Sequence, residues 1–441
     1  MITPTEVLIW TLAGSGFGVL LSWIPGFHIY NLLALVMVVS PLFLSIPEAF
    51  PYFTIGAIVS FVYLSILPTV YLSVADESLV LMLFPTQRYL MLGKGHMAVW
   101  LSLLGALGGT IIIVLSGLTF LPYIIPFVYQ IFSAYIVWII VLIIVFMFMS
   151  EWPKAGDREK TPLRRLLIAW RQTLGGLFVF FTAGLLGFII MYTGLVPARF
   201  AYVRLTPMFI GFFGMPWVLQ NIISKRHVPH QDLTDKIEAS TWGVINGTLS
   251  GAFGGYIAAF FPIVTGGMGA LVAGHMASSR GDDVFIVSQG SNRLLYYLGA
   301  FFLLFIPTSR LTRGTGAWLV SSLYTPNSWT EFYYAAFAIL VAAAVSFVMV
   351  IYMSKILAYL LSALNYIWVS YAVAVGLAII SYLLAGLPGL VVLAVATLIG
   401  LAAVAFNTRR SYCLGGLIFP VVMSMTGNVG VLLELMHLGM G

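Results

Sequence analysis

Apolar stretches follow one another along nearly the whole chain, and each is continuous rather than alternating. Runs such as 135–149 and 332–352 contain hardly a polar residue. Strands of membrane β-barrels alternate over about ten residues, whereas a transmembrane helix needs about 20 apolar residues in a row. The pattern therefore predicts an all-α polytopic membrane protein. The stretches able to cross a bilayer or dip into it are 7–24, 29–47, 52–74, 97–117, 120–149, 174–194, 207–223, 241–262, 264–278, 294–307, 332–352, 357–385, 388–406 and 414–433.

Several of these stretches are too short to span a hydrocarbon core of about 30 Å, which requires about 20 helical residues. Glycine and proline interrupt many of them. Short, interrupted segments fit half-helices or re-entrant hairpins, which are tolerated only where protein or a water-filled cavity surrounds them. We therefore expect broken or re-entrant helices among the spanning ones.

The composition supports a membrane protein, because 61% of the 441 residues are hydrophobic and only 8% are charged. A soluble domain carries about 25% charged residues. The single cysteine, Cys413, excludes an internal disulfide and a cysteine-rich metal site. The soluble catalytic motifs GK[ST], HExxH, GxSxG and CxxC are missing. We therefore expect no enzyme activity, no cofactor, no bound metal and no nucleic-acid partner.

Two segments, 151–165 and 224–238, are plainly polar and contain several lysine and arginine residues. Cytoplasmic loops of membrane proteins carry an excess of these residues, so we expect both segments in the cytoplasm. The first six residues contain neither lysine nor arginine, which favours an external N-terminus. The predicted location is the cell membrane, which the chain crosses several times.

One glycine–proline pattern occurs twice. GSGFGVLLSWIP starts at Gly14 and GAFGGYIAAFFP starts at Gly251, and each has two glycines four residues apart followed by a proline, Pro25 or Pro262. Glycines with this spacing share one helix face and let a neighbouring backbone come close, and the proline ends or kinks the helix. The alternative to a repeat is two independent glycine-rich interfaces. The matching position of the proline favours the repeat.

A repeat implies that the chain consists of two homologous halves. We expect a first transmembrane repeat at 1–195, a connector helix and cytoplasmic loop at 196–239, and a second repeat at 240–441. An external N-terminus and a cytoplasmic start of the second half would make the two repeats inverted. Corresponding broken helices in two halves indicate a transporter's binding site near the middle of the bilayer.

The breaks carry the candidate substrate site. A break exposes backbone N–H groups at the start of a half-helix, and such groups attract anions. His28 follows the first break, and an ionisable residue at membrane depth is a functional candidate, although a core histidine bonded to a carbonyl group is the alternative. The sequence SQGSN at 288–292 adds side-chain oxygens and amides. The predicted substrate-binding residues are Pro25, Gly26, His28, Asn31, Pro262, Thr265, Gly266, Gly267, Gln289, Ser291 and Asn292.

Four further carboxylates stand beside apolar stretches. Asp76 and Glu77 either bind a coupling ion or cap a helix start. We keep both interpretations of this pair open. For Asp282 and Asp283 we favour an external loop that contains an Arg–Asp pair.

Four parts of the sequence resemble the large membrane subunit of the tripartite tricarboxylate transporter family, in its divergent archaeal-type branch. GFGVLLSWIPGFHIYN is similar to the glycine–proline signature of the family's first repeat, and GTLSGAFGGYIAAFFPIVTGGMGA to that of the second. ADESLVLMLFPTQRYLMLGKGHMAVW and VFIVSQGSNRLLYYLGAFFLLFIPTSRLTRGTGAW resemble the stretches that follow. The resemblance implies a permease for small carboxylates, which works with a small membrane subunit and an extracytoplasmic binding protein.

Together these observations predict a secondary transporter that moves a small organic anion, a carboxylate by the resemblance, through alternating access coupled to H⁺ or Na⁺. It would lie among membrane lipids, and a homodimer is compatible with the sequence. One alternative is a transporter or flippase of a lipid-linked anion such as a polyprenyl phosphate. A less favoured alternative is an intramembrane enzyme that modifies a lipid.

Overall fold

The computed structural model describes residues 2–25, 27–76, 78–149, 161–197, 204–224, 228–261, 264–277, 280–308 and 311–436. Within these residues the secondary structure is helical, and none of them forms a strand. The predicted all-α fold is therefore confirmed. The chain divides into two compact units: unit 1 comprises Met1–Ala134 and Ser224–Ser370, and unit 2 comprises Tyr135–Ile223 and Tyr371–Gly441.

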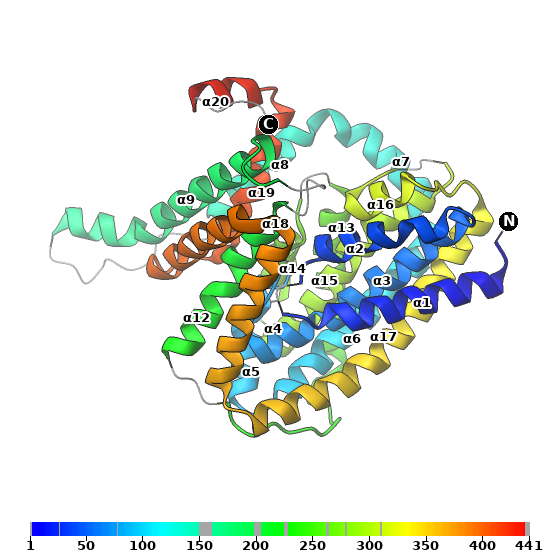
Figure 1. Ribbon diagram of the computed structural model, residues 1–441, viewed down its shortest axis with the longest axis horizontal. Coiled ribbons are helices and arrows are strands. Elements are labelled where there is room, and N and C mark those ends of the chain that lie inside the picture. Colours follow the sequence, from blue (N-terminus) through cyan, green and yellow to red (C-terminus); the bar gives the residue numbers. More distant parts are fainter. Residues whose placement is uncertain are drawn as a thin grey trace. The chain divides into compact units, whose positions relative to one another are not determined.

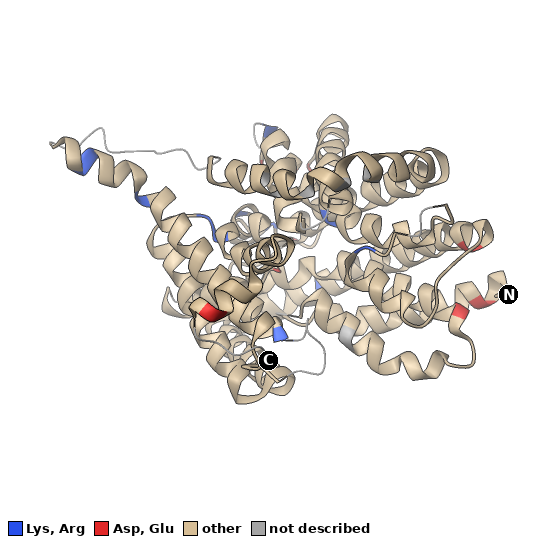
Figure 2. Ribbon diagram, turned by 90° about the horizontal axis from the view of Figure 1, so that it is seen from above, with Lys and Arg blue, Asp and Glu red and all other residues tan. Residues whose placement is uncertain are grey.

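The helices are long and apolar enough for a polytopic membrane protein. In the described part of the chain six helical segments could cross a bilayer, and up to eight could if each of two bent pairs is one span. Figure 2 shows lysine, arginine, aspartate and glutamate only at scattered points along the helices. The six segments are Pro4–Ser22, Pro47–Leu72, Gly95–Thr119, Pro162–Tyr192, Trp329–Ala363 and Tyr366–Ala405.

Both helices that carry the glycine–proline motif belong to unit 1. Helices α1, α3 and α17 lie side by side (Figure 1), and α15 packs between α13 and α6. The α-helices of this unit are α1 (Pro4–Ser22), α2 (Ile29–Val39), α3 (Phe50–Leu64), α4 (Ile66–Leu72), α5 (Leu83–Met91), α6 (Gly95–Thr119), α7 (Leu121–Phe132), α13 (Thr241–Phe260), α14 (Gly266–Ala277), α15 (Asp282–Phe302), α16 (Gly314–Ser321) and α17 (Trp329–Ala363).

The first glycine pair brings α1 against the backbone of α3. A Cβ atom added to Gly14 would overlap the carbonyl oxygen of Phe53, and one added to Gly18 would lie 2.7 Å from the carbonyl oxygen of Ala57. Gly16, on another face of α1, has no neighbour within 4 Å of such an atom. On α1, Gly14 and Gly18 are therefore required to be small, and so is Gly56 on α3, where an added Cβ would overlap the carbonyl oxygen of Thr11.

The second glycine pair acts in the same way between α13 and α15. An added Cβ at Gly251 would overlap the carbonyl oxygen of Ser288, and one at Gly255 would lie 2.7 Å from that of Asn292. In both helices, glycines four residues apart thus face carbonyl groups four residues apart. The predicted close backbone approach is confirmed at both motifs, and a common origin of the two motifs stays a prediction.

Both motifs end in a break. Helix α1 stops at Ser22, and Pro25 lies in the turn that precedes α2. Helix α13 stops at Phe260 and α14 begins at Gly266. Pro262 lies outside the described residues.

Helix α15 begins earlier than the hydrophobic pattern predicted. The apolar stretch starts at residue 294, but the helix starts at Asp282 and includes the whole polar run up to Arg293. Asp282 and Asp283 occupy its first turn, where negative charge is favourable at the positive end of the helix dipole. The predicted loop at these two aspartates is therefore wrong. Polar residues in the middle of the helix are tolerated because they are buried against polar partners.

Unit 2 contains the remaining long helices. In α18 the expected interruption between 357–385 and 388–406 is present, because Gly386 adopts a left-handed φ of 64° just before Pro388. The α-helices of this unit are α8 (Ile136–Met149), α9 (Pro162–Tyr192), α11 (Thr206–Phe209), α12 (Met215–Ile223), most of α18 (Tyr366–Ala405), α19 (Gly415–Met425) and α20 (Val429–Leu435).

Candidate functional site

A buried ion pair lies in unit 1. Arg293, on α15, is 1% exposed, and each of its three nitrogen atoms donates one hydrogen bond. Nη2 donates to Asp76 Oδ2 (2.9 Å), Nη1 to the carbonyl oxygen of Val62 (2.8 Å) and Nε to Ser78 Oγ (2.9 Å). The guanidinium carbon also lies 5.1 Å from the centre of the Phe61 ring. Arg293 is thus held on all sides by the protein.

Asp76 caps the turn that follows it and also pairs with Arg293, and its binding of a coupling ion stays a prediction. Its Oδ1 accepts hydrogen bonds from the backbone N–H groups of Ser78 (2.9 Å) and Leu79 (3.1 Å), as a capping carboxylate does. Its Oδ2 pairs with Arg293. The carboxylate therefore fixes the 76–79 turn and supplies the negative charge that Arg293 requires. Glu77, the other candidate for the coupling ion, lies outside the described residues.

The two breaks meet at this turn. His28 is the N-cap of α2, is 3% exposed and lies within electrostatic range of Asp76. Gly266 starts α14, and a Cβ added to it would lie 2.9 Å from the Cβ of Ser78. The segments that follow the two glycine–proline motifs thus border the Asp76–Arg293 pair. Gly26 lies outside the described residues.

The backbone donors after the first break are partly used by the chain itself. The Tyr30 N–H group donates to Nδ1 of His28 (3.3 Å), and the Phe27 N–H group donates to the carbonyl oxygen of Ile24 (3.2 Å). Asn31 is buried in the first turn of α2. His28 therefore acts as the capping residue of α2.

Two amide side chains connect α15 to α14. Gln289 Nε2 donates to the carbonyl oxygen of Ala270 (3.1 Å), and Asn292 Nδ2 donates to that of Gly266 (3.2 Å). Because a carbonyl group can only accept, these contacts fix which end of each amide faces α14. The remaining oxygens, Oε1 of Gln289 and Oδ1 of Asn292, are buried without a hydrogen-bond partner. Unsatisfied buried acceptors of this kind suit a cation or a proton donor.

The other predicted residues lie around this network. Ser291 donates its hydroxyl to the carbonyl oxygen of Thr248 (2.9 Å), so its side chain faces α13. Thr265 Oγ1 accepts from the backbone N–H group of Met268 (3.4 Å) and so caps α14. Gly267 is buried in the first turn of that helix. These residues position the helices around the centre.

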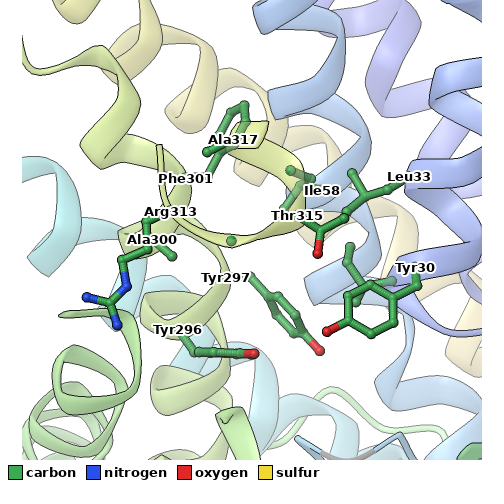
Figure 3. Close-up of a pocket in the computed structure, with 13 residues that line it drawn as sticks. Tyr30, Leu33, Ile58, Tyr296, Tyr297, Ala300, Phe301, Arg313, Thr315 and Ala317 are labelled. Atoms are coloured by element: carbon green, nitrogen blue, oxygen red, sulfur yellow. The ribbon is translucent and has the colours of Figure 1, made fainter. Parts of the chain in front are cut away.

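A pocket of about 100 Å³ lies against the same part of α15. In Figure 3 the hydroxyl groups of Tyr30 and Tyr297 point toward one another, and Thr315 projects from the chain above them. The Tyr297 ring also lies 5.7 Å from the guanidinium carbon of Arg293, so one side chain separates the pocket from the ion pair. The lining residues are Ile29, Tyr30, Leu33, Ile58, Tyr296, Tyr297, Ala300, Phe301, Arg313, Gly314, Thr315, Gly316 and Ala317.

A second polar cluster in unit 1 was not predicted from the sequence. His96 Nδ1 lies 2.7 Å from Ser354 Oγ, and His96 Nε2 lies 3.0 Å from Asp235 Oδ1. Hydrogen bonds from Lys355 and His96 lower the pKa of Asp235 to about 2. Ser354 is fully buried, and its Oγ also lies 2.7 Å from the Tyr71 hydroxyl rather than facing a solute. The cluster instead fixes segment 228–240 to α6 and α17.

Sequence reasoning also missed the central role of Arg293. The available signal was a single arginine followed by an apolar stretch, since an arginine at membrane depth is rare and needs a partner. Its partner could not be read from the sequence, because Asp76 is 217 residues away. Ser78 was missed for the same reason.

The fold and the site define a polytopic helical membrane protein with interrupted helices around a buried charged centre, which is the construction of membrane transport proteins. The chain belongs to the tripartite tricarboxylate transporter TctA family, whose sequence model matches residues 8–415. The predicted family is thereby confirmed, and the protein is a membrane transporter component.

The chain is also similar to an uncharacterized protein of Methanocaldococcus jannaschii. The two are 23% identical over 428 residues, which cover 94% of this chain and 98% of that protein. No solved structure matches the chain.

Proposed function

We propose that the protein is a secondary transporter that moves a small carboxylate by alternating access and is not an enzyme. The observation that carries the proposal is the pocket on α15, one side chain away from the buried Asp76–Arg293 pair. The family supports transport of a carboxylate. We further propose a binding site for the anion and a separate one for the coupling ion.

The pocket is the proposed carboxylate site. Tyr30, Tyr296 and Tyr297 bring hydroxyl groups to its wall, and Arg313 brings a positive charge. Gly314 and Gly316 line it at the start of α16, where the first N–H groups of a helix have no partner within the helix. Hydroxyl donors, helix N–H groups and a guanidinium group together favour a carboxylate over a neutral or cationic solute.

The coupling ion is proposed to bind at the buried oxygens of Gln289 and Asn292, on the same helix as Arg293. Arg293 uses its three nitrogens within the protein, so we assign it a positioning role for the 76–79 turn. Either Na⁺ or a proton carried by a hydronium ion would satisfy the unpaired acceptors. His28, which lies within electrostatic range of Asp76, is proposed to connect protonation to the start of α2.

The name of the family, a tripartite transporter family, also supports the presence of partner proteins in the transport cycle. We propose that a small membrane subunit and an extracytoplasmic binding protein work with the chain. Segments 151–165 and 224–238 are proposed to face the cytoplasm, and the two motif-bearing halves of the chain to be inverted repeats.

Replacing Tyr297 with phenylalanine tests the pocket with the loss of a single hydroxyl group. A hydrogen bond to a charged group contributes about 1.5–3 kcal/mol, so the apparent affinity for the carboxylate is expected to fall at least tenfold. The measurement is the thermal unfolding midpoint of the purified full chain, titrated with citrate and with succinate. Tyr333→Phe is the matched control, because Tyr333 is 55% exposed on α17 and lies outside the pocket.

The same titration separates the candidate functions. Stabilisation of the unsubstituted chain by citrate or succinate that is lost in Tyr297→Phe and kept in Tyr333→Phe supports the proposal. Equal responses of both variants would show that the pocket does not bind the carboxylate. Stabilisation by a polyprenyl phosphate with no response to either carboxylate would support a lipid-linked anion instead.

A further inference from the structure

Among the residues that the structure describes, two arginines are buried, and their surroundings differ sharply. Arg293 in unit 1 is 1% exposed and has a carboxylate partner. Arg410 in unit 2 is 8% exposed, and it forms no ion pair with any carboxylate of the described residues. Removing a charged guanidinium group from water is unfavourable unless an opposite charge comes with it. Arg410 therefore lacks the carboxylate partner that Arg293 has in Asp76.

The contacts of Arg410 leave part of its guanidinium group unused. Nη2 donates to Oε1 of Gln220 on α12 (3.2 Å), and the guanidinium carbon lies 4.3 Å from the centre of the Trp217 ring. Nη1 is buried and has no hydrogen-bond partner. Trp217 and Gln220 thus hold the guanidinium plane in place but do not neutralise it.

The next residue adds a second unused donor. Ser411 is 2% exposed, and its Oγ has no hydrogen-bond partner. Both residues belong to the short 3₁₀ segment Arg410–Leu414, which precedes α19. Two adjacent buried side chains therefore offer an N–H and an O–H group that the protein leaves unpaired. A neutral ligand could satisfy these donors, but only an anion also compensates the charge.

We propose that Arg410, Ser411 and Gln220 form an oxyanion-binding site in unit 2, distinct from the pocket on α15. Its ligand is a phosphate or carboxylate group, because guanidinium N–H groups match the oxygens of such groups in geometry and charge. Trp217 stacks on the guanidinium group and keeps it oriented toward the ligand. The inference does not depend on the proposed transport activity.

The site is tested with Arg410→Gln in the purified full chain. In buffer and detergent free of multivalent anions, this variant is expected to unfold at a temperature equal to or higher than the unsubstituted chain, because an unpaired buried charge is removed. Addition of inorganic phosphate, citrate or phosphatidylglycerol in mixed micelles is then expected to raise the midpoint of the unsubstituted chain. The variant should lose at least nine-tenths of that rise.

Arg171→Gln is the matched control, because Arg171 is a cation of the same unit that donates to the carbonyl oxygen of Ala405 (3.1 Å) from a more exposed position. This control should keep the full rise. A rise with soluble anions alone identifies a free anion, and a rise with phosphatidylglycerol but not phosphatidylcholine identifies a lipid headgroup. No rise with any of these probes, or an equal rise in Arg410→Gln, would overturn the proposal. So would an Arg410→Gln chain that unfolds at a lower temperature in anion-free buffer.

Discussion

Replacing Arg293 with methionine is expected to destabilise the protein by about 3–5 kcal/mol, the usual effect of breaking a buried ion pair by removing one partner. Methionine fills a similar volume but leaves Asp76 as an unpaired charge that is 7% exposed. It also leaves the carbonyl oxygen of Val62 and the hydroxyl of Ser78 without their donor. Chemical unfolding of the purified chain, followed by tryptophan fluorescence, measures the loss.

The exposed pair Arg88–Asp282 provides the control for this substitution. It has the same N–O distance of 2.9 Å, but its side chains are 71% and 40% exposed. Pairs of this kind contribute about 0–1 kcal/mol, so Arg88→Met should change stability very little. The double variant Asp76→Leu with Arg293→Met should regain part of the stability that Arg293→Met loses, because no lone charge remains buried. Equal effects of Arg293→Met and Arg88→Met would show that the buried pair is not a structural centre.

Leucine in place of Gly14 or Gly251 is expected to destabilise the protein at the upper end of the range of about 1–3 kcal/mol that is typical of overpacking. At both positions the added side chain would meet a backbone carbonyl oxygen of the neighbouring helix, which cannot move aside as a side chain can. The helices would have to separate. The thermal unfolding midpoints of the two variants measure the effect.

Gly16→Leu is the control on the same helix. Nothing lies within 4 Å of a Cβ at this position, and exposed substitutions of this kind change stability by about 0.5 kcal/mol or less. If Gly14→Leu and Gly16→Leu unfold at the same temperature, the close approach of α1 to α3 is not required. A large effect at only one of Gly14 and Gly251 would count against equivalent roles for the two motifs.

The elements that could be predicted from the sequence are those that depend on local patterns. Apolar length identified most of the spanning helices, although the predicted stretch 357–385 runs across the break between α17 and α18. The glycine–proline spacing identified both breaks. The close approach of backbones at the glycines was predicted because two glycines on one helix face let a neighbouring helix come close. The start of α15 was missed because hydropathy alone places it after the polar residues 282–293. These residues belong to the helix, and most of them are buried in the interior of the unit.

The candidate site could be predicted only in part, because its partners are distant in the sequence. His28, Gly266 and Asn292 were recognised as neighbours of the breaks, and the structure brings them around the 76–79 turn. The pairing of Asp76 with Arg293 and the direction of the Asn292 amide depend on how α15 packs, which no local pattern encodes. The unpaired donors of Arg410 and Ser411 likewise become visible only once burial and contacts are known.

Carboxylate uptake by the purified full-length chain in proteoliposomes is the most direct test of the transport assignment. The measurement compares radiolabelled citrate and succinate with and without imposed Na⁺ and pH gradients, for the unsubstituted chain and for Tyr297→Phe and Tyr333→Phe. The account predicts gradient-dependent accumulation of a carboxylate that requires at least tenfold more substrate in Tyr297→Phe and is unchanged in Tyr333→Phe. Folded protein that accumulates neither carboxylate under any gradient would contradict it.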